Sequence, residues 1–209
     1  LILLCNSNTK LSDYTFSNAE LDYIVKKQKN NTEIIEINQY TRKVFIVVLK
    51  KEKNSHKHYE KCRMIGDRLA GKLKNQTSIS IIVHKKSQEE TMLIAEGIAL
   101  SNYTFLKHKN NAPANKLKTI FLCGTSDQKQ INELQNIVDA VYFTRDLVNE
   151  PFSHLTAKDL ANLAVKSGKK FNFKTTVFNK KKIESLKMGG VLAVNKGSLD
   201  EPTFTVMEW

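Results

Sequence analysis

The side chains that could bind a metal ion or act as a general base are scattered along this sequence. It has five histidines, and none of them belongs to an HExxH motif or to a pair spaced i, i+4. Those are the spacings that place two imidazoles on one zinc ion. We therefore expect surface or hydrogen-bonded histidines rather than metal ligands at His56, His58, His84, His108 and His154.

Two further arrangements resemble catalytic groups. Ser153 directly precedes His154, but sequence neighbours do not usually present Oγ to an imidazole. No glycine flanks them to supply an oxyanion hole. The carboxylate pairs Glu89-Glu90 and Asp200-Glu201 are adjacent in sequence, so their side chains should point apart. We expect neither arrangement to be catalytic.

Phosphate binding by a glycine-rich loop is not indicated. The chain has eight glycines but contains no GxGxxG or GxxxxGK[ST] motif, and Gly189-Gly190 follows a predicted helix rather than a strand. Lys196 in the run NKGS resembles a lysine ligand segment only superficially, because no aspartate-bearing strand follows it. We interpret Lys196 as structural.

One predicted helix is strongly basic. Acidic Glu60 and Asp67 interrupt its cations, which lie on several faces, and Tyr59 is the aromatic residue nearby that could stack on a base. A solvated helix face is the favoured interpretation, and nucleic-acid binding is the alternative. The cations concerned are Lys57, Lys61, Arg63, Arg68, Lys72 and Lys74.

The composition is typical of a globular protein. Of 209 residues, 41% are hydrophobic and 26% charged, and the net charge is +12. Residues 1–150 carry 23 basic and 16 acidic groups and residues 151–209 carry 10 and 5, so the excess is spread along the chain. The longest apolar runs, 1–5 and 44–49, are too short to cross a membrane and do not form a signal peptide. Because the chain begins at Leu1 rather than methionine, we expect a trimmed sequence.

The three cysteines, Cys5, Cys62 and Cys123, have no CxxC spacing. We expect buried, reduced thiols and a cytoplasmic location.

Strand and helix patterns alternate in the first part of the chain. The apolar runs 1–5, 33–38, 43–50, 78–84 and 118–124 predict strands. A capping box at Ser17 and Glu20 predicts a helix with Leu21, Ile24 and Val25 on one face. Two more helices are expected over 56–73, with Cys62, Ile65, Leu69 and Leu73 buried, and over 88–103. The alternation predicts an α/β fold with a largely parallel or mixed sheet flanked by helices.

A long helix and a second set of elements follow. The helix should cover 129–150 and end at Pro151, with an apolar stripe formed by Ile131, Leu134, Val138, Val141, Tyr142 and Val148. Thr156 and Asp159 predict a second capping box, with Leu155 against Leu160. Beyond it we expect a strand over 171–178, a helix over 180–187, a Gly189-Gly190 turn and strands over 191–195 and 203–209. The predicted division is an α/β domain over 1–128, an interdomain helix over 129–150 and the beginning of a second α/β domain over 151–209.

The run RDLVNEP at 145–151 is followed by Leu155-Thr156, Met188-Gly189 and then Lys196-Gly197-Ser198, Pro202 and Glu208-Trp209. In this order the motifs resemble the leucyl aminopeptidase family, the di-metal cytosol aminopeptidases. A weaker similarity covers AEGIALSNYTFLKHK at 95–109. Ala157 stands where the family usually has proline, Ser153 and His154 replace a commoner Asn and apolar residue, and Trp209 replaces a tyrosine.

The resemblance implies a macro-domain-like amino-terminal domain joined to the start of a catalytic domain. The family's metal ligands come later, in Gly-Lys-Gly and Asn-Thr-Asp-Ala-Glu-Gly-Arg segments that this sequence lacks. The complete enzyme would use two divalent ions, zinc, manganese or magnesium, to activate water and release amino-terminal residues from peptides. No catalytic, metal-binding or substrate-binding residue is expected within 1–209.

The partners implied by the resemblance are the remainder of the catalytic domain, the other subunits of a homo-hexamer and the peptide substrate. This segment would support assembly and access to the active site. The alternatives are a stand-alone macro-like binding or regulatory module and a DNA-binding protein that uses its basic surface.

Overall fold

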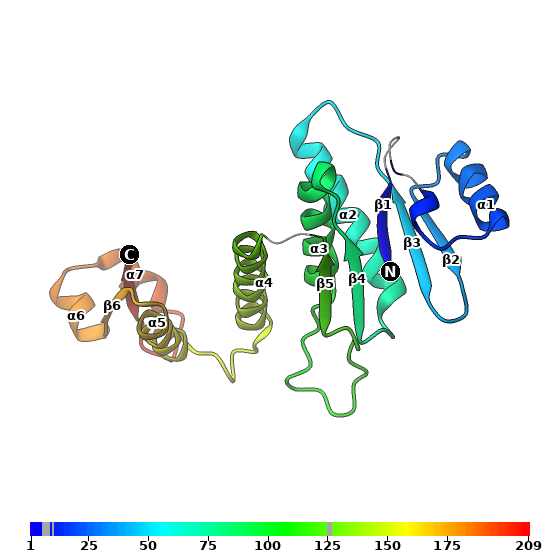
Figure 1. Cartoon of the computed structure of the whole chain (residues 1–209). Coiled ribbons are helices and arrows are strands. Elements are labelled where there is room, and N and C mark those ends of the chain that lie inside the picture. The colour runs from blue at the N-terminus through cyan, green and yellow to red at the C-terminus, as the bar shows by residue number, and fades with distance from the viewer. Residues whose placement is uncertain (6–8, 10, 125–126) are drawn as a thin grey trace. The chain divides into compact units, whose positions relative to one another are not determined.

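The computed structural model describes residues 1–5, 9, 11–124 and 127–209, which form two units, 1–143 and 144–209 (Figure 1). The long helix α4 (Gln128–Asn149) begins in unit 1 and ends in unit 2. None of the helices in the described part of the chain combines the length and apolar character that a membrane crossing requires.

Unit 1 is built on a five-stranded sheet with the order β2-β3-β1-β4-β5. Its strands β1, β3, β4 and β5 run parallel, and β2 joins the edge antiparallel to β3. This arrangement confirms the predicted α/β fold with a mostly parallel sheet. The strands are β1 (Ile2–Cys5), β2 (Ile34–Asn38), β3 (Lys43–Val48), β4 (Ser78–Ile82) and β5 (Thr119–Cys123).

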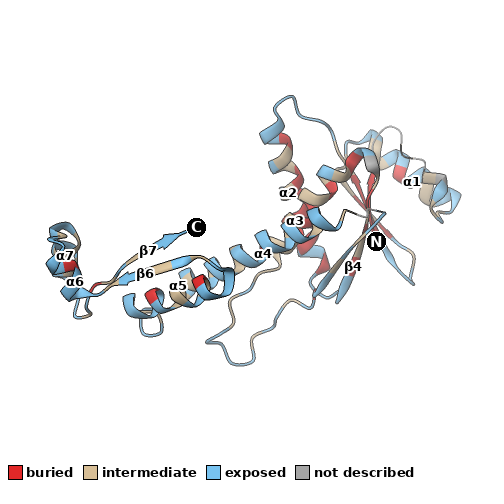
Figure 2. Ribbon diagram, turned by 60° about the vertical axis from the view of Figure 1, so that its left-hand side comes forward, coloured by how far each residue is buried: buried red, intermediate tan, exposed pale blue. Residues whose placement is uncertain are grey.

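Helices cover both faces of this sheet, as parallel strands require. On one face α2 (Ser55–Leu73) and α3 (Gln88–Ser101) enclose a core that includes Ile65, Leu69 and Ile94, each fully buried. On the other face α1 (Asn18–Lys29) packs by Ile24 against β2 and its neighbours. Short 3₁₀ helices lie at Leu11–Asp13 and Lys85–Ser87. Figure 2 shows the buried positions on the strands and on the inward sides of α2 and α3.

The two helices on the first face cross closely because each carries a glycine at the crossing. A Cβ atom on Gly97 would lie 2.2 Å from the Arg63 carbonyl oxygen, and one on Gly66 would lie 2.4 Å from that of Ile94. Both distances are far inside van der Waals contact, so only glycine allows this spacing.

Most local signals in unit 1 act as expected. Ser17 accepts a hydrogen bond from the Glu20 amide, and the Glu20 side chain accepts one from the Ser17 amide, which completes the capping box. The expected apolar face of α1 is narrower than predicted, because Ile24 is buried but Val25 is 45% exposed. Val25 lies one residue around the helix from Ile24, beyond the width that the sheet covers.

The junction between α4 and α5 (Ala157–Phe171) confirms the predicted stop and start signals. The helix α4 ends at Asn149, two residues before Pro151. Thr156 and Asp159 form a capping box with an Asp159 amide to Thr156 Oγ1 distance of 3.3 Å. The Thr156 hydroxyl and backbone amide both donate to Asp159 Oδ2, at 2.6 and 3.0 Å, and these two hydrogen bonds lower the pKa of Asp159. On α4 itself the predicted stripe is wrong at its end, since Val148 is 78% exposed.

Unit 2 contains an antiparallel pair, β6 (Lys174–Phe178) and β7 (Phe204–Glu208), on which α5 packs. The basic helix α6 (Lys180–Ser185) agrees with the prediction. The strand predicted from residue 171 begins three residues later, because α5 continues to Phe171 and ends with Asn172 in a left-handed C-cap.

The predicted strand over 191–195 is wrong, and so is the predicted turn at Gly189-Gly190. Residues Gly189–Asn195 form helix α7 instead. Val191, Leu192 and Asn195 are half-buried while Val194 is 86% exposed, which is a helical rather than an alternating pattern. A short apolar run does not by itself distinguish the two structures.

Candidate functional site

Ser153 and His154 lie in the turn between α4 and α5, and their geometry corrects the prediction. Ser153 Oγ is 2.9 Å from His154 Nδ1, so these neighbours do present hydroxyl to imidazole. Both side chains are exposed to water. The backbone amides of His154 and Leu155 donate to the Pro151 carbonyl and do not point at an oxyanion position. The arrangement therefore fits a turn-stabilising hydrogen bond better than a nucleophile.

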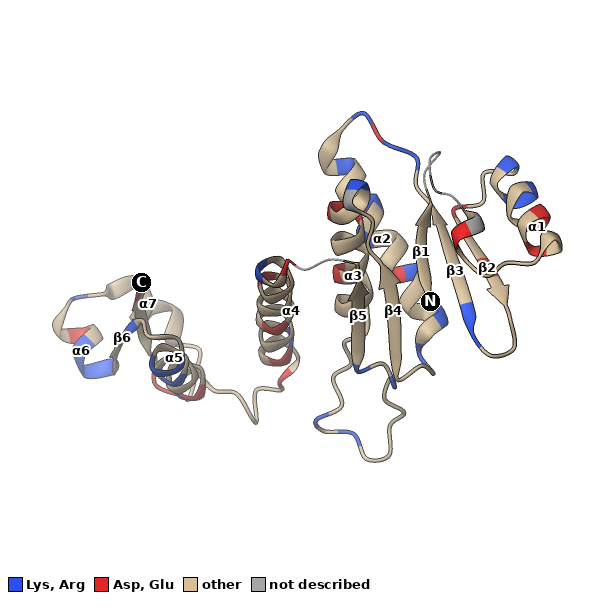
Figure 3. Ribbon diagram, in the orientation of Figure 1, with Lys and Arg blue, Asp and Glu red and all other residues tan. Residues whose placement is uncertain are grey.

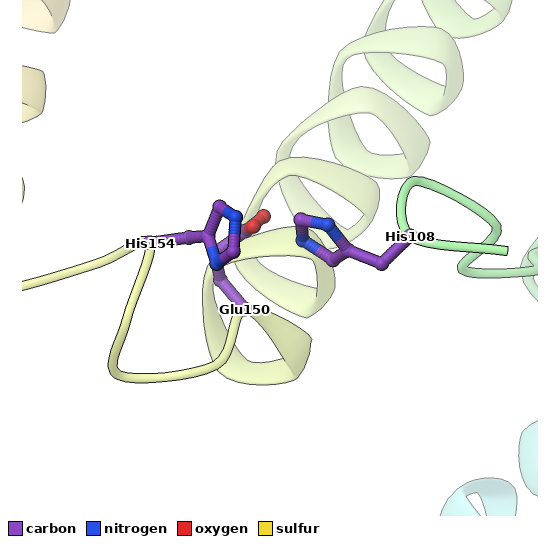
Figure 4. A group of neighbouring side chains, drawn as sticks. All are labelled: His108, Glu150 and His154. Atoms are coloured by element: carbon purple, nitrogen blue, oxygen red, sulfur yellow. The ribbon is translucent and has the colours of Figure 1, made fainter.

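Three side chains with metal-ligand atoms are shown in Figure 4. His108 belongs to unit 1, whereas Glu150 and His154 belong to unit 2, where their ligand atoms lie within 4.8 Å of each other. A single unit thus supplies one carboxylate and one imidazole, fewer than the three or four protein ligands of ordinary zinc sites. Within either unit, the described residues bring no three metal-ligand side chains together. The described residues of each unit therefore do not fit a two-metal centre.

The remaining histidines lie apart from one another. His84 Nε2 is 3.1 Å from the Tyr14 hydroxyl, as expected for a hydrogen-bonded histidine, and His56 is exposed. His58 is buried, and its Nε2 lies 3.5 Å from Glu90 Oε1. Its Nδ1 has no hydrogen-bond partner among the described residues, so the expectation of a surface or fully hydrogen-bonded histidine is wrong for this atom.

The cysteines differ from one another in exposure. All three are free thiols, but only Cys5 and Cys62 are buried, and Cys123 on β5 is exposed, contrary to the prediction. Burial raises the pKa of the Cys5 thiol to about 11 and that of Cys62 to about 11. A thiolate is disfavoured at both buried positions, which argues against a reactive role.

Glu89 and Glu90 contact different partners, as expected for side chains that point apart. Glu89 accepts a hydrogen bond from the Tyr59 hydroxyl, which raises the Tyr59 pKa, while Glu90 lies beside His58. Glu201 pairs with Lys158 at 3.1 Å. Lys196 is an exposed residue at the end of α7.

Four of the six cations on or beside the basic helix α2 form ion pairs with acidic side chains. Figure 3 marks the basic and acidic positions along the ribbon. Arg68 lies 2.8 Å from Glu33 and Lys72 lies 3.1 Å from Glu36, both on or beside β2. Lys61 contacts Glu33 and Glu52, and Arg63 contacts Glu96 at 3.0 Å. Cations that are already paired contribute less to a phosphate-binding surface. The pairing favours the solvated helix face over a nucleic-acid interface.

These ion pairs predict a loss of stability in acid. A hydrogen bond from Arg68 lowers the pKa of Glu33 in the folded state, and Lys61 adds to that effect. A carboxylate with a depressed folded-state pKa stabilises the fold above its unfolded pKa, and this stabilisation is lost as the pH falls through the folded value. Replacing Glu33 by glutamine should therefore flatten the dependence of the urea midpoint on pH, measured from about pH 7 to about pH 3.

The matched control is Glu60→Gln, since Glu60 is 64% exposed and makes a longer i, i+3 contact of 3.8 Å to Arg63. This variant should keep the dependence of the parent chain. An unchanged acid profile in Glu33→Gln would contradict the role given to Glu33.

Comparison with known proteins places these elements in a family. Residues 142–209 match the sequence model of the cytosol aminopeptidase family, catalytic domain. A curated relative from Chlorobaculum parvum, named "Probable cytosol aminopeptidase", is 62% identical over 65 residues, which are 31% of this chain and 13% of the relative. Residues 142–209 of this chain belong to the cytosol aminopeptidase family. The resemblance drawn from its motifs is thereby confirmed.

The similarity to these aminopeptidases extends beyond the matched segment. A relative of the same printed name from Clostridium perfringens is 28% identical over 92% of this chain and 43% of its own length. A solved structure of a tomato leucine aminopeptidase mutant aligns with a TM-score of 0.74 at 17% identity, covering 99% of this chain and 47% of that one. The chain thus spans less than half the length of the proteins it matches.

Proposed function

We propose that this chain is the amino-terminal, non-catalytic portion of a leucyl aminopeptidase-type exopeptidase that removes amino-terminal residues from peptides in the cytoplasm. The supporting observation is the family match over residues 142–209, which contains the ordered motifs but neither of the later ligand segments. In this proposal residues 1–128 form the amino-terminal domain, 129–150 the interdomain helix and 151–209 the start of the catalytic domain.

The complete enzyme would use two divalent ions, zinc, manganese or magnesium. The residues described within either unit do not fit such a pair, so we place its ligands, and the catalytic and substrate-binding residues, outside this segment. The segment alone should then be inactive. Its role would be to support assembly of a homo-hexamer and to shape access to the active site.

The surface of unit 2 supports a partner in the remainder of the catalytic domain. Apolar side chains on both faces of the β6–β7 pair are exposed: Val177 and Met207, on one face, are 38% and 61% exposed, and Phe204, on the other, is 38% exposed. Exposed apolar side chains grouped on a small sheet are typical of a surface that packs against further structure. The rest of a catalytic domain would bury them.

The test is to isolate the native protein from its source cells, measure its intact mass, and assay leucine p-nitroanilide hydrolysis with added Mn²⁺ or Zn²⁺. We expect a mass about twice 23.8 kDa, consistent with the 47% coverage of the solved relative, and activity that a chelator removes. The 209-residue chain, assayed at equal concentration, should show no metal-dependent hydrolysis. A native mass of 23.8 kDa, or hydrolysis by the 209-residue chain, would refute the proposal.

A further inference from the structure

Unit 1 contains a cavity of about 320 Å³ between α3, β5 and the first part of α4. Its volume lies at the lower end of the range of small-molecule sites, roughly 300–1,000 Å³. The walls are partly apolar: Ile120 and Leu122 project from one face of β5, and Leu134 and Val138 from one face of α4. None of these residues is singled out by the sequence as functional.

Four of the polar lining residues, Asn102, Lys118, Asp139 and Tyr142, lie near one another. The Tyr142 hydroxyl donates to the Ala99 carbonyl, which places this part of α4 beside the end of α3. At the same end Asn102 Nδ2 donates to the Leu117 carbonyl at 2.9 Å, next to Lys118. Asp139 is one helical turn before Tyr142 on the same face of α4. Lys118, Asp139 and Asn102 therefore gather where the cavity is polar.

A cation and an anion are both available at this end. Lys118 and Asp139 are exposed, and neither forms an ion pair with any residue in the described part of the chain. Asp139 accepts a hydrogen bond of 2.8 Å from Gln135 Nε2, which leaves further acceptor capacity on its carboxylate. A ligand could thus meet one positive and one negative group while its remainder enters the apolar part.

We propose that this cavity binds a free α-amino acid with a medium-sized apolar side chain, of the leucine type. Its carboxylate would meet Lys118, its ammonium would meet Asp139, and its side chain would contact Ile120, Leu134 and Val138. A fatty acid or an alkylamine would match one of the two charges only. The residues that line the cavity are the basis for amino-acid binding. A role of this site in sensing the enzyme's product rests on the proposed function, because an exopeptidase releases such amino acids.

The test is calorimetric titration of the 209-residue chain with L-leucine, which we expect to bind saturably. The analogues 4-methylpentanoate, which lacks the ammonium, and isopentylamine, which lacks the carboxylate, should bind about fivefold to tenfold more weakly, because each loses a charge-assisted contact. Glycine should bind far more weakly, because it has no side chain to enter the apolar part.

Variants locate the site. Lys118→Met and Asp139→Asn should each weaken leucine binding about fivefold to tenfold without affecting the fold, because both side chains are exposed. The matched controls are Lys116→Met, outside the cavity lining, and Glu133→Gln, on α4 but not in that lining. Both controls should bind leucine as the parent chain does.

Absence of leucine binding at millimolar concentration would overturn the inference, as would equal binding of leucine and both analogues. Equal losses in the controls and in the cavity variants would assign binding to another surface and would also overturn it. None of these readouts uses peptidase activity, so the inference can fail while the native protein proves to be an aminopeptidase. Conversely, an inactive native protein whose chain binds leucine would retain the site and refute only the proposed function.

Discussion

Replacement of Gly97 by alanine is expected to destabilise unit 1 by at least about 3 kcal/mol, the upper end of the usual cost of overpacking. The new Cβ would lie 2.2 Å from the Arg63 carbonyl oxygen and 2.9 Å from the Arg63 Cα. These are backbone atoms of α2, so no side-chain rotation can relieve the clash. The two helices would have to separate, and their contact helps to bury Ile65, Ile94 and Ile98. Domains of this size have about 5–15 kcal/mol of stability in total, so much of it would be lost.

Gly71→Ala is the matched control on α2. A Cβ at Gly71 would meet no atom within 4 Å, so the only effect expected is the higher helix propensity of alanine, a gain of roughly 0.5–1 kcal/mol. Urea denaturation followed by circular dichroism measures both variants. If Gly97→Ala and Gly71→Ala shift the midpoint in the same direction, the close helix crossing is wrong.

The sequence predicts local structure well where a short segment contains its own stop or start signal. The capping boxes at Ser17 and Thr156 depend on residues three positions apart, and the end of α4 depends on Pro151. Such signals need no partner from elsewhere in the chain. The Ile- and Val-rich strands are also predicted, since β1 and β3 are buried almost throughout.

The sequence-based predictions fail where contacts between distant segments determine the secondary structure or the burial of a residue. The run at 191–195 is apolar enough for a strand, yet it lies in helix α7, where its half-buried and exposed residues follow a helical rather than an alternating pattern. Val25 and Val148 fit apolar stripes in the sequence, but no packed element in their own unit covers them. The glycines of the α2–α3 crossing carry no sequence signal that distinguishes them from Gly71, because only the approach of a second helix makes a Cβ intolerable.

The candidate sites also differ in whether a local sequence signal reveals them or only the folded structure does. Family membership can be inferred from the order of motifs between Arg145 and Trp209, because those residues are contiguous enough to be compared directly. The cavity of unit 1 has no such signature. Lys118 directly precedes β5 and Asp139 lies on α4, 21 positions further along the chain. Their common location depends on how α4 packs beside β5. The Ser153–His154 contact depends on the turn that Pro151 starts, which residue types alone do not specify.

Phe45→Ala is expected to cost about 3–5 kcal/mol of folding free energy, the usual range when a buried phenylalanine is truncated. Phe45 is 2% exposed in β3, an interior strand of the sheet, where it is paired with Ile2 of β1 and Glu36 of β2. Its ring belongs to the core beneath α2 and α3. Truncation would leave a cavity enclosed by a sheet and two closely crossed helices, which have little freedom to collapse into it.

Phe121→Ala provides the comparison, since Phe121 lies in the edge strand β5 of the same sheet and is 53% exposed. Both substitutions remove the β-strand preference of phenylalanine, so the difference between them measures mainly burial. We expect Phe121→Ala to cost under about 1 kcal/mol. Urea midpoints of the two variants give the comparison directly. Equal losses would mean that Phe45 is no more buried than Phe121, which would contradict the placement of β3 inside the sheet and of β5 at its edge. A larger loss at Phe45 would place the main core of unit 1 between this sheet and the α2–α3 pair.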